Sequence, residues 1–428
     1  MINDFFYFLG QVPFGFWMFW ITVFLGFVAW KMWVHYIQQD FISGIDFVLL
    51  EIIPPREVVR SPQAMELFLS NALYHWSLKG GIEEYWQGAV WFWFSLEIVS
   101  IEGQVHFYVR TPTRVRELIE TQMYAQYPQA QIREVPDYTL AVDEISEKSN
   151  WRMWGCEFGF VKEDPYPIKT YVDFGLDEDP KEEYKVDPIS PVIEFFGSLK
   201  KGEQAWLQIV ITPSKKTYKH HGKKVDWIEH GHLTLEKVAA PFTKYSENKK
   251  EGGWSKEMRM PKWLENQVTG INAKISKLGF DTGIRVCYVA TKDAWNMNNR
   301  RNIRLIFRQY ANPYMNQFWR MNSTQGDAYG GIFSIGSKKV TKLADRMLHE
   351  YRERNFFHLP LRHKIFCEHN IPWPISPAIF MAYKHPPVIV LNLEEIATIW
   401  HFPGQILKVP TLERIESKEA SPPPNLPS

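Results

Sequence analysis

A predicted β-hairpin at residues 92–109, FWFSLEIVSIEGQVHFYV, decides how the chain folds. The apolar side chains that alternate along its two arms are Phe92, Phe94, Leu96 and Ile98, then Val105, Phe107 and Val109. A period of two is typical of strands that bury one face. Glu102-Gly103 joins the two arms, as in a short hairpin turn. We therefore expect two antiparallel strands here.

The segments that flank the hairpin extend it to a larger unit. Ile45–Ile53 is strand-like, and a helix is predicted from Ser61-Pro62, with the serine as its cap and the proline at its first position. After the hairpin, a second helix opens at Thr111-Pro112, and Ala130–Val135 is a short strand. The order β-α-β-β-α-β predicts a ferredoxin-like (split βαβ) module over residues 45–140.

Residues 150–292 are predicted to repeat this order. A leading strand around Trp154–Phe160 pairs with Ile168–Phe174, and His232–Lys237 is a candidate for the middle strand. The other predicted elements are a helix from Ser190-Pro191, a strand at Ala205–Thr212, a helix marked by Leu264, Val268, Ile271, Ile275 and Leu278, and a strand at Ile284–Tyr288. Residues 214–260 are an insertion in this second ferredoxin-like module.

The remaining C-terminal residues form two regions. Residues 293–405 are predicted as a helical and mixed segment, with helices at 298–310 and 340–354, a glycine loop at Gly330-Gly331, a strand at 387–391 and a helix at 394–401. Residues 406–428 are a proline-rich tail. The predicted fold class is α+β, with one N-terminal transmembrane helix followed by the two modules and this mixed segment. A chain of 428 residues suits two or three domains.

Residues 1–36 are predicted to be a membrane anchor, which a linker at 36–44 joins to the rest. Residues 13–34, PFGFWMFWITVFLGFVAWKMWV, carry one charge, Lys31, and at ~1.5 Å per residue they span a ~30 Å hydrocarbon core. The side chains expected in lipid or at its two boundaries are Trp17, Trp20, Phe24, Phe27, Trp30 and Trp33. The rival interpretation is a cleaved signal peptide. Because Lys31 follows the apolar run, we expect a single-pass protein of the cell membrane with a cytoplasmic C-terminal body.

Composition excludes few function classes. The net charge of +1 gives no electrostatic reason to expect nucleic acid as the main partner. Cys156, Cys287 and Cys367 lack metal-ligand spacing, so we expect buried free thiols in a reducing compartment.

No complete catalytic motif occurs, and we expect no enzyme activity and no cofactor. The nearest phosphate loop, Gly331–Lys338, reads GIFSIGSK and inverts the order of lysine and hydroxyl that a Walker A loop requires.

The histidines lie together at His220, His221, His230 and His232. On a strand, His230 and His232 would point the same way and could hold a divalent metal, or serve a DNA-processing nuclease. The interpretation without a functional site is a solvent-exposed insertion, because residues 214–260 carry 11 Lys/Arg against 6 Asp/Glu. With Tyr218, Trp227 and Tyr245 interspersed, contact with single-stranded DNA or acidic headgroups is a further alternative.

Several phrases resemble one known family. They are LEIIPPRE at Leu50–Glu57, SPQAME at Ser61–Glu66, GEQAWLQI at Gly202–Ile209, VLNLEEIATIWHFPG at Val390–Gly404 and PTLER at Pro410–Arg414. They are similar to the membrane-bound N-terminal region of conjugative-transfer ATPases of the TraG/HerA-like type, found in bacterial type IV secretion. In these relatives such a region leads into a motor domain, which is not present in this sequence.

The resemblance implies a non-catalytic, membrane-tethered adaptor or scaffold that positions a separate type IV secretion ATPase and that assembles as a homo-oligomer.

 The sequence does not set the number of copies. The segment where anchor and motor would join is the expected partner contact, and its residues are Ile396, Trp400, His401, Phe402, Pro403 and Gly404. Expected partners are the lipid bilayer and the ATPase. Two alternatives stay open, namely a metal-dependent or DNA-processing enzyme that uses the His220–His232 segment, and a membrane structural protein without a motor partner.

Overall fold

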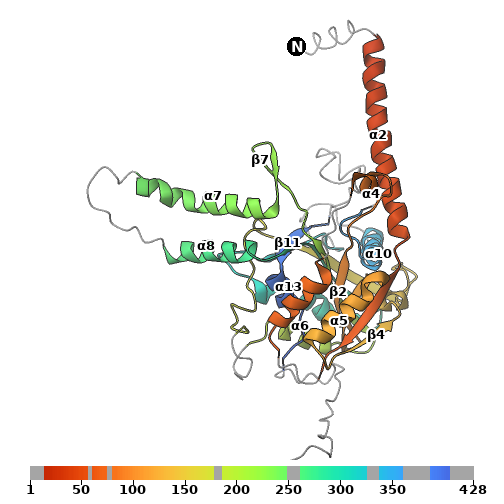
Figure 1. Cartoon of the computed structure of the whole chain (residues 1–428). Coiled ribbons are helices and arrows are strands. Elements are labelled where there is room, and N and C mark those ends of the chain that lie inside the picture. The colour runs from red at the N-terminus through yellow and green to blue at the C-terminus, as the bar shows by residue number, and fades with distance from the viewer. Residues whose placement is uncertain are drawn as a thin grey trace, which may run out of the picture. The chain divides into compact units, whose positions relative to one another are not determined.

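The structure is a computed structural model that describes residues 14–55, 60–74, 80–177, 186–247, 261–324, 337–359 and 386–404. It has the predicted α+β class, with an apolar N-terminal helix and a mostly antiparallel sheet (Figure 1). The described residues fall into two compact units. The first holds residues 14–46, 80–91 and 357–359, and the second holds the rest. The predicted glycine loop at Gly330-Gly331, Cys367 and the tail at 406–428 lie outside the described residues.

The first unit is built on α2 (Phe14–Ser43), a helix of 30 residues. The predicted linker at 36–44 is therefore helical as far as Ser43. The segment Met18–Ser43 is long and apolar enough to cross a membrane, which is also true of a signal sequence. The other described helix of this unit is α4 (Gly81–Tyr85).

The second unit is organised around one nine-stranded sheet with the order β10-β5-β9-β6-β2-β3-β1-β4, and β11 pairs with β9 beside this path. The strands are β1 (Phe47–Ile53), β2 (Phe94–Ile101), β3 (Gln104–Pro112), β4 (Gln131–Val135), β5 (Trp151–Phe160), β6 (Glu203–Pro213), β9 (Gly279–Thr291), β10 (Phe318–Met321) and β11 (Ile389–Asn392). Every pairing in it is antiparallel.

The sheet consists of two halves with the same strand order. The first half runs β4-β1-β3-β2, and the second runs β10-β5-β9-β6. In each half the first and second strands flank the third, which is antiparallel to both. The order of elements predicted for residues 45–135 is found, and a likeness to ferredoxin-like proteins stays a prediction. β2 and β6 pair along eight residues, from Phe94↔Ile211 to Ile101↔Gln204, and so join the halves.

The predicted hairpin is formed by β2 and β3, which pair from Ser95↔Arg110 to Ile101↔Gln104. Its turn requires two residues with positive φ, Glu102 at 53° and Gly103 at 89°. A Cβ on Gly103 would also lie 2.5 Å from the carbonyl oxygen of Leu199. Glycine at this position is therefore needed for backbone conformation and for space.

Two predictions for the second half are wrong. β5 pairs with β9 and β10, and residues 168–174 are coil and turn, because Phe318–Met321 occupies the outer edge of β5 instead. His232–Lys237 lies within the helix α7 (Trp227–Glu247), whose apolar residues recur at helical spacing. The insertion also contains a small hairpin of β7 (Tyr218–His220) and β8 (Lys223–Val225). α7 lies beside α8 (Lys262–Ile275), as Figure 1 shows.

The other helical elements lie in predicted helical regions with shifted ends, except that η3 was not predicted and the helix predicted at 298–310 is divided into α9, η4 and η5. They are α3 (Gln63–Phe68), the π-helical turn η1 (Leu69–Leu73), the 3-10 turns η2 (Thr113–Val115), η3 (Tyr138–Ala141), η4 (Ile303–Leu305) and η5 (Arg308–Tyr310), and the helices α5 (Arg116–Gln126), α6 (Ser190–Gly197), α9 (Met297–Asn302), α10 (Ser337–Glu353) and α13 (Leu393–Ile399). At the start of α3 the Ser61 side chain makes no capping bond, since Pro62 is the N-cap.

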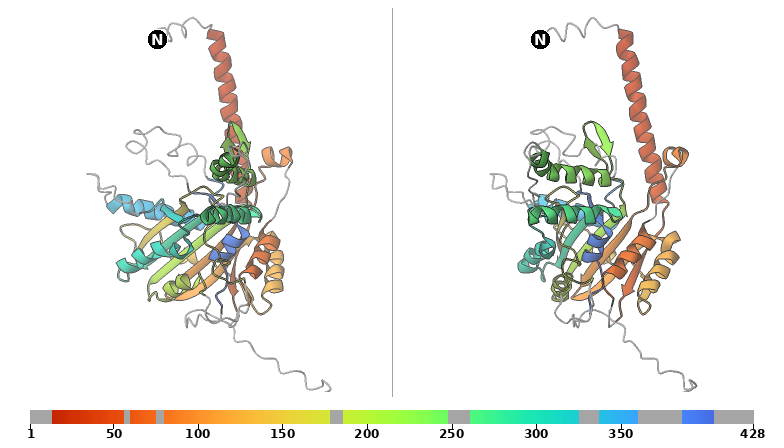
Figure 2. Two further views of the ribbon diagram at one scale, coloured as in Figure 1. Left: turned by 90° about the vertical axis from the view of Figure 1, so that its left-hand side faces the viewer. Right: turned by 60° about the vertical axis from the view of Figure 1, so that its left-hand side comes forward.

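Helices cover both faces of the sheet. One face packs against α3, α5, α6 and α13, and the main apolar core lies there. The other face packs against α10 and the η3 segment through a smaller core that includes Trp206, Cys287 and Tyr351. Figure 2 shows α10 on the side of the sheet opposite α5.

A row of polar side chains crosses the sheet on the α10 face. Successive cross-strand partners along it are Arg133, Glu51, Tyr108, Glu97, Gln208, Arg285 and Glu157. All except Arg133 are buried. We call this set the polar row. Buried polar groups are costly unless they have hydrogen-bond partners, and α10 supplies many of those partners.

Arg354, directly after α10, holds the centre of the polar row. Its Nε donates to Glu97 Oε1 at 2.7 Å, and its Nη1 donates to Asp137 Oδ2 at 2.6 Å. Burial alone would lower the pKa of Arg354, but Glu97, Tyr138 and Asp137 raise it well above its ordinary value. Further along, Arg285 Nε donates to Glu157 Oε1 at 2.9 Å, and its Nη1 donates to the Glu350 carbonyl at 2.8 Å.

We predict that Glu97→Gln destabilises the fold strongly. The substitution keeps the shape of the side chain but leaves the buried Arg354 charge with less compensation, and breaking a buried pair costs about 3–5 kcal/mol. The measurement is urea unfolding of the full-length protein in detergent. The control Glu144→Gln is exposed and should change the stability by less than about 0.5 kcal/mol. Equal unfolding midpoints for the two variants would contradict the assigned role of the ion pair.

Candidate functional site

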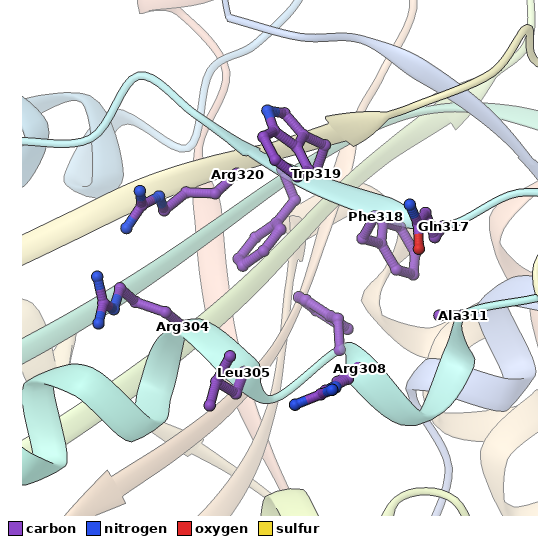
Figure 3. A pocket seen from close by; sticks show the side chains of 10 residues that line it. Arg304, Leu305, Arg308, Ala311, Gln317, Phe318, Trp319 and Arg320 are labelled. Atoms are coloured by element: carbon purple, nitrogen blue, oxygen red, sulfur yellow. The ribbon is translucent and has the colours of Figure 1, made fainter. Parts of the chain in front are cut away.

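A basic and aromatic pocket lies between β10 and the turns η4 and η5. Its volume is about 340 Å³, within the range of small-ligand sites. It is lined by Phe158, Arg304, Leu305, Phe307, Arg308, Ala311, Gln317, Phe318, Trp319 and Arg320. We call it the arginine pocket. Figure 3 shows the guanidinium groups of Arg304 and Arg320 at one end, with Trp319 on the β10 side and Leu305 on the opposite side.

Aromatic packing forms the base of the arginine pocket. The Phe307 ring lies 4.8 Å from both the Phe158 and the Phe318 ring, with an edge-to-face angle of 80° to Phe158. Such pairs add stability beyond their buried area. At the rim, Trp319 is 63% exposed and Leu305 is 55% exposed. A rigid apolar base thus carries large apolar side chains that face solvent.

Local hydrogen bonds position the two walls. The Asn296 side chain accepts from Asn298 N and begins α9. Before β10, the Asn316 Nδ2 group donates to the carbonyls of Glu163 and Tyr166 at 3.2 and 3.1 Å. Asn316 Oδ1 accepts from Lys162 N at 3.0 Å. The buried amide of Asn316 therefore fixes the chain that leads into Trp319 and Arg320.

The electrostatics of the arginine pocket favour an anion. Within the described part of the chain, no carboxylate lies within ion-pair distance of Arg304 or Arg308. The pKa of the neighbouring Arg300 lies below its ordinary value because of burial and because Arg304, Arg301, Arg152 and Arg320 repel its charge. Guanidinium groups bind carboxylates and phosphates with paired hydrogen bonds. The arrangement can therefore bind an anionic group beside an apolar or aromatic one.

The predicted histidine site is not assembled. His230 and His232 lie on α7, where residues two apart point in different directions, so the expectation that both rings face one way is wrong. Among the described residues no group of three or more His, Cys, Asp or Glu could hold a metal ion. His220 ends β7, and His221 follows in its turn with a φ of 44°.

His230 instead lines a second, more open pocket of about 440 Å³. Its ring stacks on Tyr218 at 4.0 Å, and burial lowers its pKa despite nearby Glu163 and Asp164. Asp164 accepts hydrogen bonds from Lys216, at 2.6 Å, and from Tyr218. These contacts tie β7 and the residues before it to the segment that follows β5, so these polar groups have structural partners.

The predicted partner segment is packed inside the second unit. Ile396 and Trp400 are 0% exposed, and His401 and Phe402 are 2% exposed. Pro403 is buried as well, and Gly404 is partly exposed. Trp400 belongs to the main core, where its ring lies 6.5 Å from Phe68. A partner would have to displace this segment to reach these side chains. The partner contact itself stays a prediction.

The predicted anchor residues all lie on α2. Trp20, Phe24, Phe27, Trp30 and Trp33 are each at least 44% exposed, as expected for side chains that face lipid. Cys156 and Cys287 are buried free thiols, in agreement with the sequence, and burial raises the pKa of each.

Sequence reasoning missed the arginine pocket. A signal was present in residues 300–308, RRNIRLIFR, where Arg300, Arg304 and Arg308 recur every four residues. That spacing places cations on one side of a helical segment. The sequence did not show that Trp319 and Arg320 line this pocket, because their position depends on the pairing of β10 with β5.

These features define a mixed α+β protein with a two-part antiparallel sheet, an apolar N-terminal helix and a pocket lined by arginine and aromatic side chains. The chain belongs to the family described as "Domain of unknown function (DUF8128)", whose model matches residues 92–358. The match includes the joining strands β2 and β6, α10 and the whole arginine pocket. No curated protein matches the chain.

His401 also forms a buried pair that gives a testable pH dependence. Its Nδ1 faces the Ala397 carbonyl at 2.8 Å, and its Nε2 lies 3.0 Å from Asp187 Oδ1. Burial would raise the pKa of Asp187, but His401 and the backbone N–H groups of Ile189 and Gly404 outweigh it and lower the pKa. The charged carboxylate therefore stabilises the fold at neutral pH. This contribution is lost as the pH falls through the lowered pKa.

We predict that Asp187→Asn lowers the free energy of unfolding at pH 7 by about 1–3 kcal/mol, the usual value for a hydrogen bond to a charged group. The difference from the wild type should shrink on acidification to about pH 3, below the ordinary carboxyl pKa. Urea unfolding of the full-length protein at both pH values measures it. The exposed control Asp143→Asn should show neither effect, and a difference for Asp187→Asn that grows in acid would contradict the assignment.

Proposed function

We propose that this protein is a non-catalytic, membrane-tethered adaptor or scaffold of a bacterial type IV secretion- or conjugation-like system. In this proposal α2 crosses the cell membrane once, and the second unit lies on the cytoplasmic side. There it holds a separate ATPase chain, with several copies of the adaptor forming a homo-oligomer. The resemblance of Leu50–Glu57 and Val390–Gly404 to the anchoring region of TraG/HerA-like ATPases supports this system.

The observation that carries the proposal is the arginine pocket, which offers a binding site for a partner. The same chain has an apolar helix that is long enough to cross a membrane. Arginine and tryptophan are enriched among the residues that dominate protein–protein affinity. Arg304, Arg308 and Trp319 combine these side chains around an aromatic base. An acidic segment of the partner that carries an apolar side chain fits this chemistry. The pocket therefore replaces the buried 396–404 segment as our preferred contact for the ATPase.

We predict that Arg304→Glu/Arg308→Glu releases the partner. Reversing two charges replaces attraction for an acidic segment by repulsion, and truncating or reversing such contacts costs several kcal/mol. The measurement is co-purification of a Walker-containing chain with the tagged full-length protein from native membranes. The matched control is Lys148→Glu/Lys201→Glu, which reverses two exposed charges elsewhere. Absence of any such chain from the wild-type preparation would favour the structural protein without a motor partner.

Single-stranded nucleic acid binding is a second candidate function at the same site. The specific observation is Trp319, which is 63% exposed. It lines the same pocket as Arg320, its neighbour in β10, and as Arg304 and Arg308 of the η4 and η5 region. Bases stack on such rings while arginines contact phosphates.

We predict that an oligo-dT ligand, if bound, loses affinity in Trp319→Ala by about 1–3 kcal/mol per stacked base. Binding should also weaken steeply with salt. An affinity that Trp319→Ala leaves unchanged would exclude the pocket as a nucleic-acid site.

A further inference from the structure

The short helix α4 of the first unit exposes an unusual amount of apolar surface. Ile82 is 75% exposed, Tyr85 is 44% exposed and Trp86 is 68% exposed. The spacing of i, i+3 and i+4 places them on one side of the helical turn. Glu83 and Glu84 occupy the positions between them. The turn is therefore amphipathic, with an apolar side that stays largely exposed among the described residues.

The apolar side of α4 is continuous with the apolar surface of α2. The Tyr85 ring lies 6.1 Å from the Trp30 ring, and the Trp86 ring lies 6.4 Å from the Trp33 ring. Both tryptophans belong to the C-terminal part of the predicted anchor. Tryptophan and tyrosine concentrate at the boundary between hydrocarbon and headgroups. The four rings thus form one aromatic cluster at a single level of α2.

Backbone contacts fix α4 at that level. Gly88 has a φ of +68°, and a Cβ there would lie 2.3 Å from the carbonyl oxygen of Ile37. Only glycine allows the chain to approach α2 so closely. Within the loop, Gln87 N donates to the Ile82 carbonyl at 3.1 Å, and Ala89 N donates to the Glu83 carbonyl at 2.9 Å. The position of α4 beside α2 is therefore built into the fold of the first unit.

The length of α2 agrees with a membrane boundary at this cluster. A helix of 30 residues is longer than the roughly 20 residues that a bilayer core requires. If the span begins near Phe14, it ends near Trp33, and the last turns of α2 lie outside the hydrocarbon. Lys31 lies in the last turn before this boundary, where a flexible lysine side chain can reach the headgroups.

We propose that α4 is a second membrane-contacting element, which inserts Ile82, Tyr85 and Trp86 into the headgroup boundary of the bilayer that α2 crosses. The inference rests on the proposed membrane tether. Glu83 and Glu84 stay in water, as on other interfacial helices with one polar side. With α2 alone the helix is free to rotate and slide, whereas α4 adds a contact that sets its depth.

The test uses spin labels on the full-length protein in phosphatidylcholine/phosphatidylglycerol vesicles. Cys367→Ser provides the background, because Cys156 and Cys287 are buried. One cysteine is then introduced by Ile82→Cys, by Glu84→Cys on the other side of α4, by Phe24→Cys within α2, or by Leu140→Cys, which is 72% exposed in the second unit. Collision rates with oxygen, which is enriched in lipid, and with a water-soluble nickel complex report the surroundings of each label.

We expect the ratio of oxygen to nickel collisions at Ile82→Cys to approach that at Phe24→Cys, while Glu84→Cys resembles Leu140→Cys. A lipid-like ratio at Phe24→Cys with a water-like ratio at Ile82→Cys would overturn the role of α4 and leave the tether intact. Low collision rates with both reagents at Ile82→Cys would also overturn it, because they indicate a protein cover such as a second copy. A water-like ratio at Phe24→Cys would instead refute the tether itself.

Discussion

The pairing of β2 with β6 is the constraint on which the second unit depends. Eight residue pairs join two half-sheets into one sheet. Glu97 and Gln208 face each other at this seam, in the middle of the polar row. Gln208 Nε2 donates to Glu97 Oε1 at 3.2 Å and to the Tyr351 carbonyl at 3.0 Å. Because these groups are buried, the seam requires the cover of α10 and the charge of Arg354. Strand pairing, helix position and ion pairs at the centre of the sheet are therefore interdependent.

Local sequence signals were sufficient for most of the fold. Alternation predicted β2, β3, β6 and β9, and helical spacing predicted α5, α8 and α10, because each of these elements buries one regular face. The errors came from long-range pairing. Nothing in Ile168–Phe174 shows that the edge of β5 is taken by Phe318–Met321, more than a hundred residues away. His232–Lys237 misled because a short run with some alternation also fits one side of a helix.

Functional residues were harder to predict than elements. The aromatic residues of α2 were readable because membrane anchors have a strong compositional signal. The arginine pocket needs β10 to lie opposite Arg304 and Arg308, and this contact depends on the tertiary fold. The segment Ile396–Gly404 was chosen from a resemblance. Its large apolar side chains serve the core, which is the commoner use of such residues. A charged residue in the middle of an apolar strand, such as Glu97 in SLEIV or Glu51 in FVLLEII, was a signal of the polar row.

The shared seam has a consequence for dividing the chain into fragments. A polypeptide that ended between β4 and β5 would leave the inner edge of its own half open along β2. A polypeptide that began there would expose the matching edge of β6. Unpaired edges of this length recruit other strands and promote aggregation or strand exchange between molecules. The two halves resemble each other in order, yet neither is an autonomous domain, and expression boundaries belong outside the whole sheet.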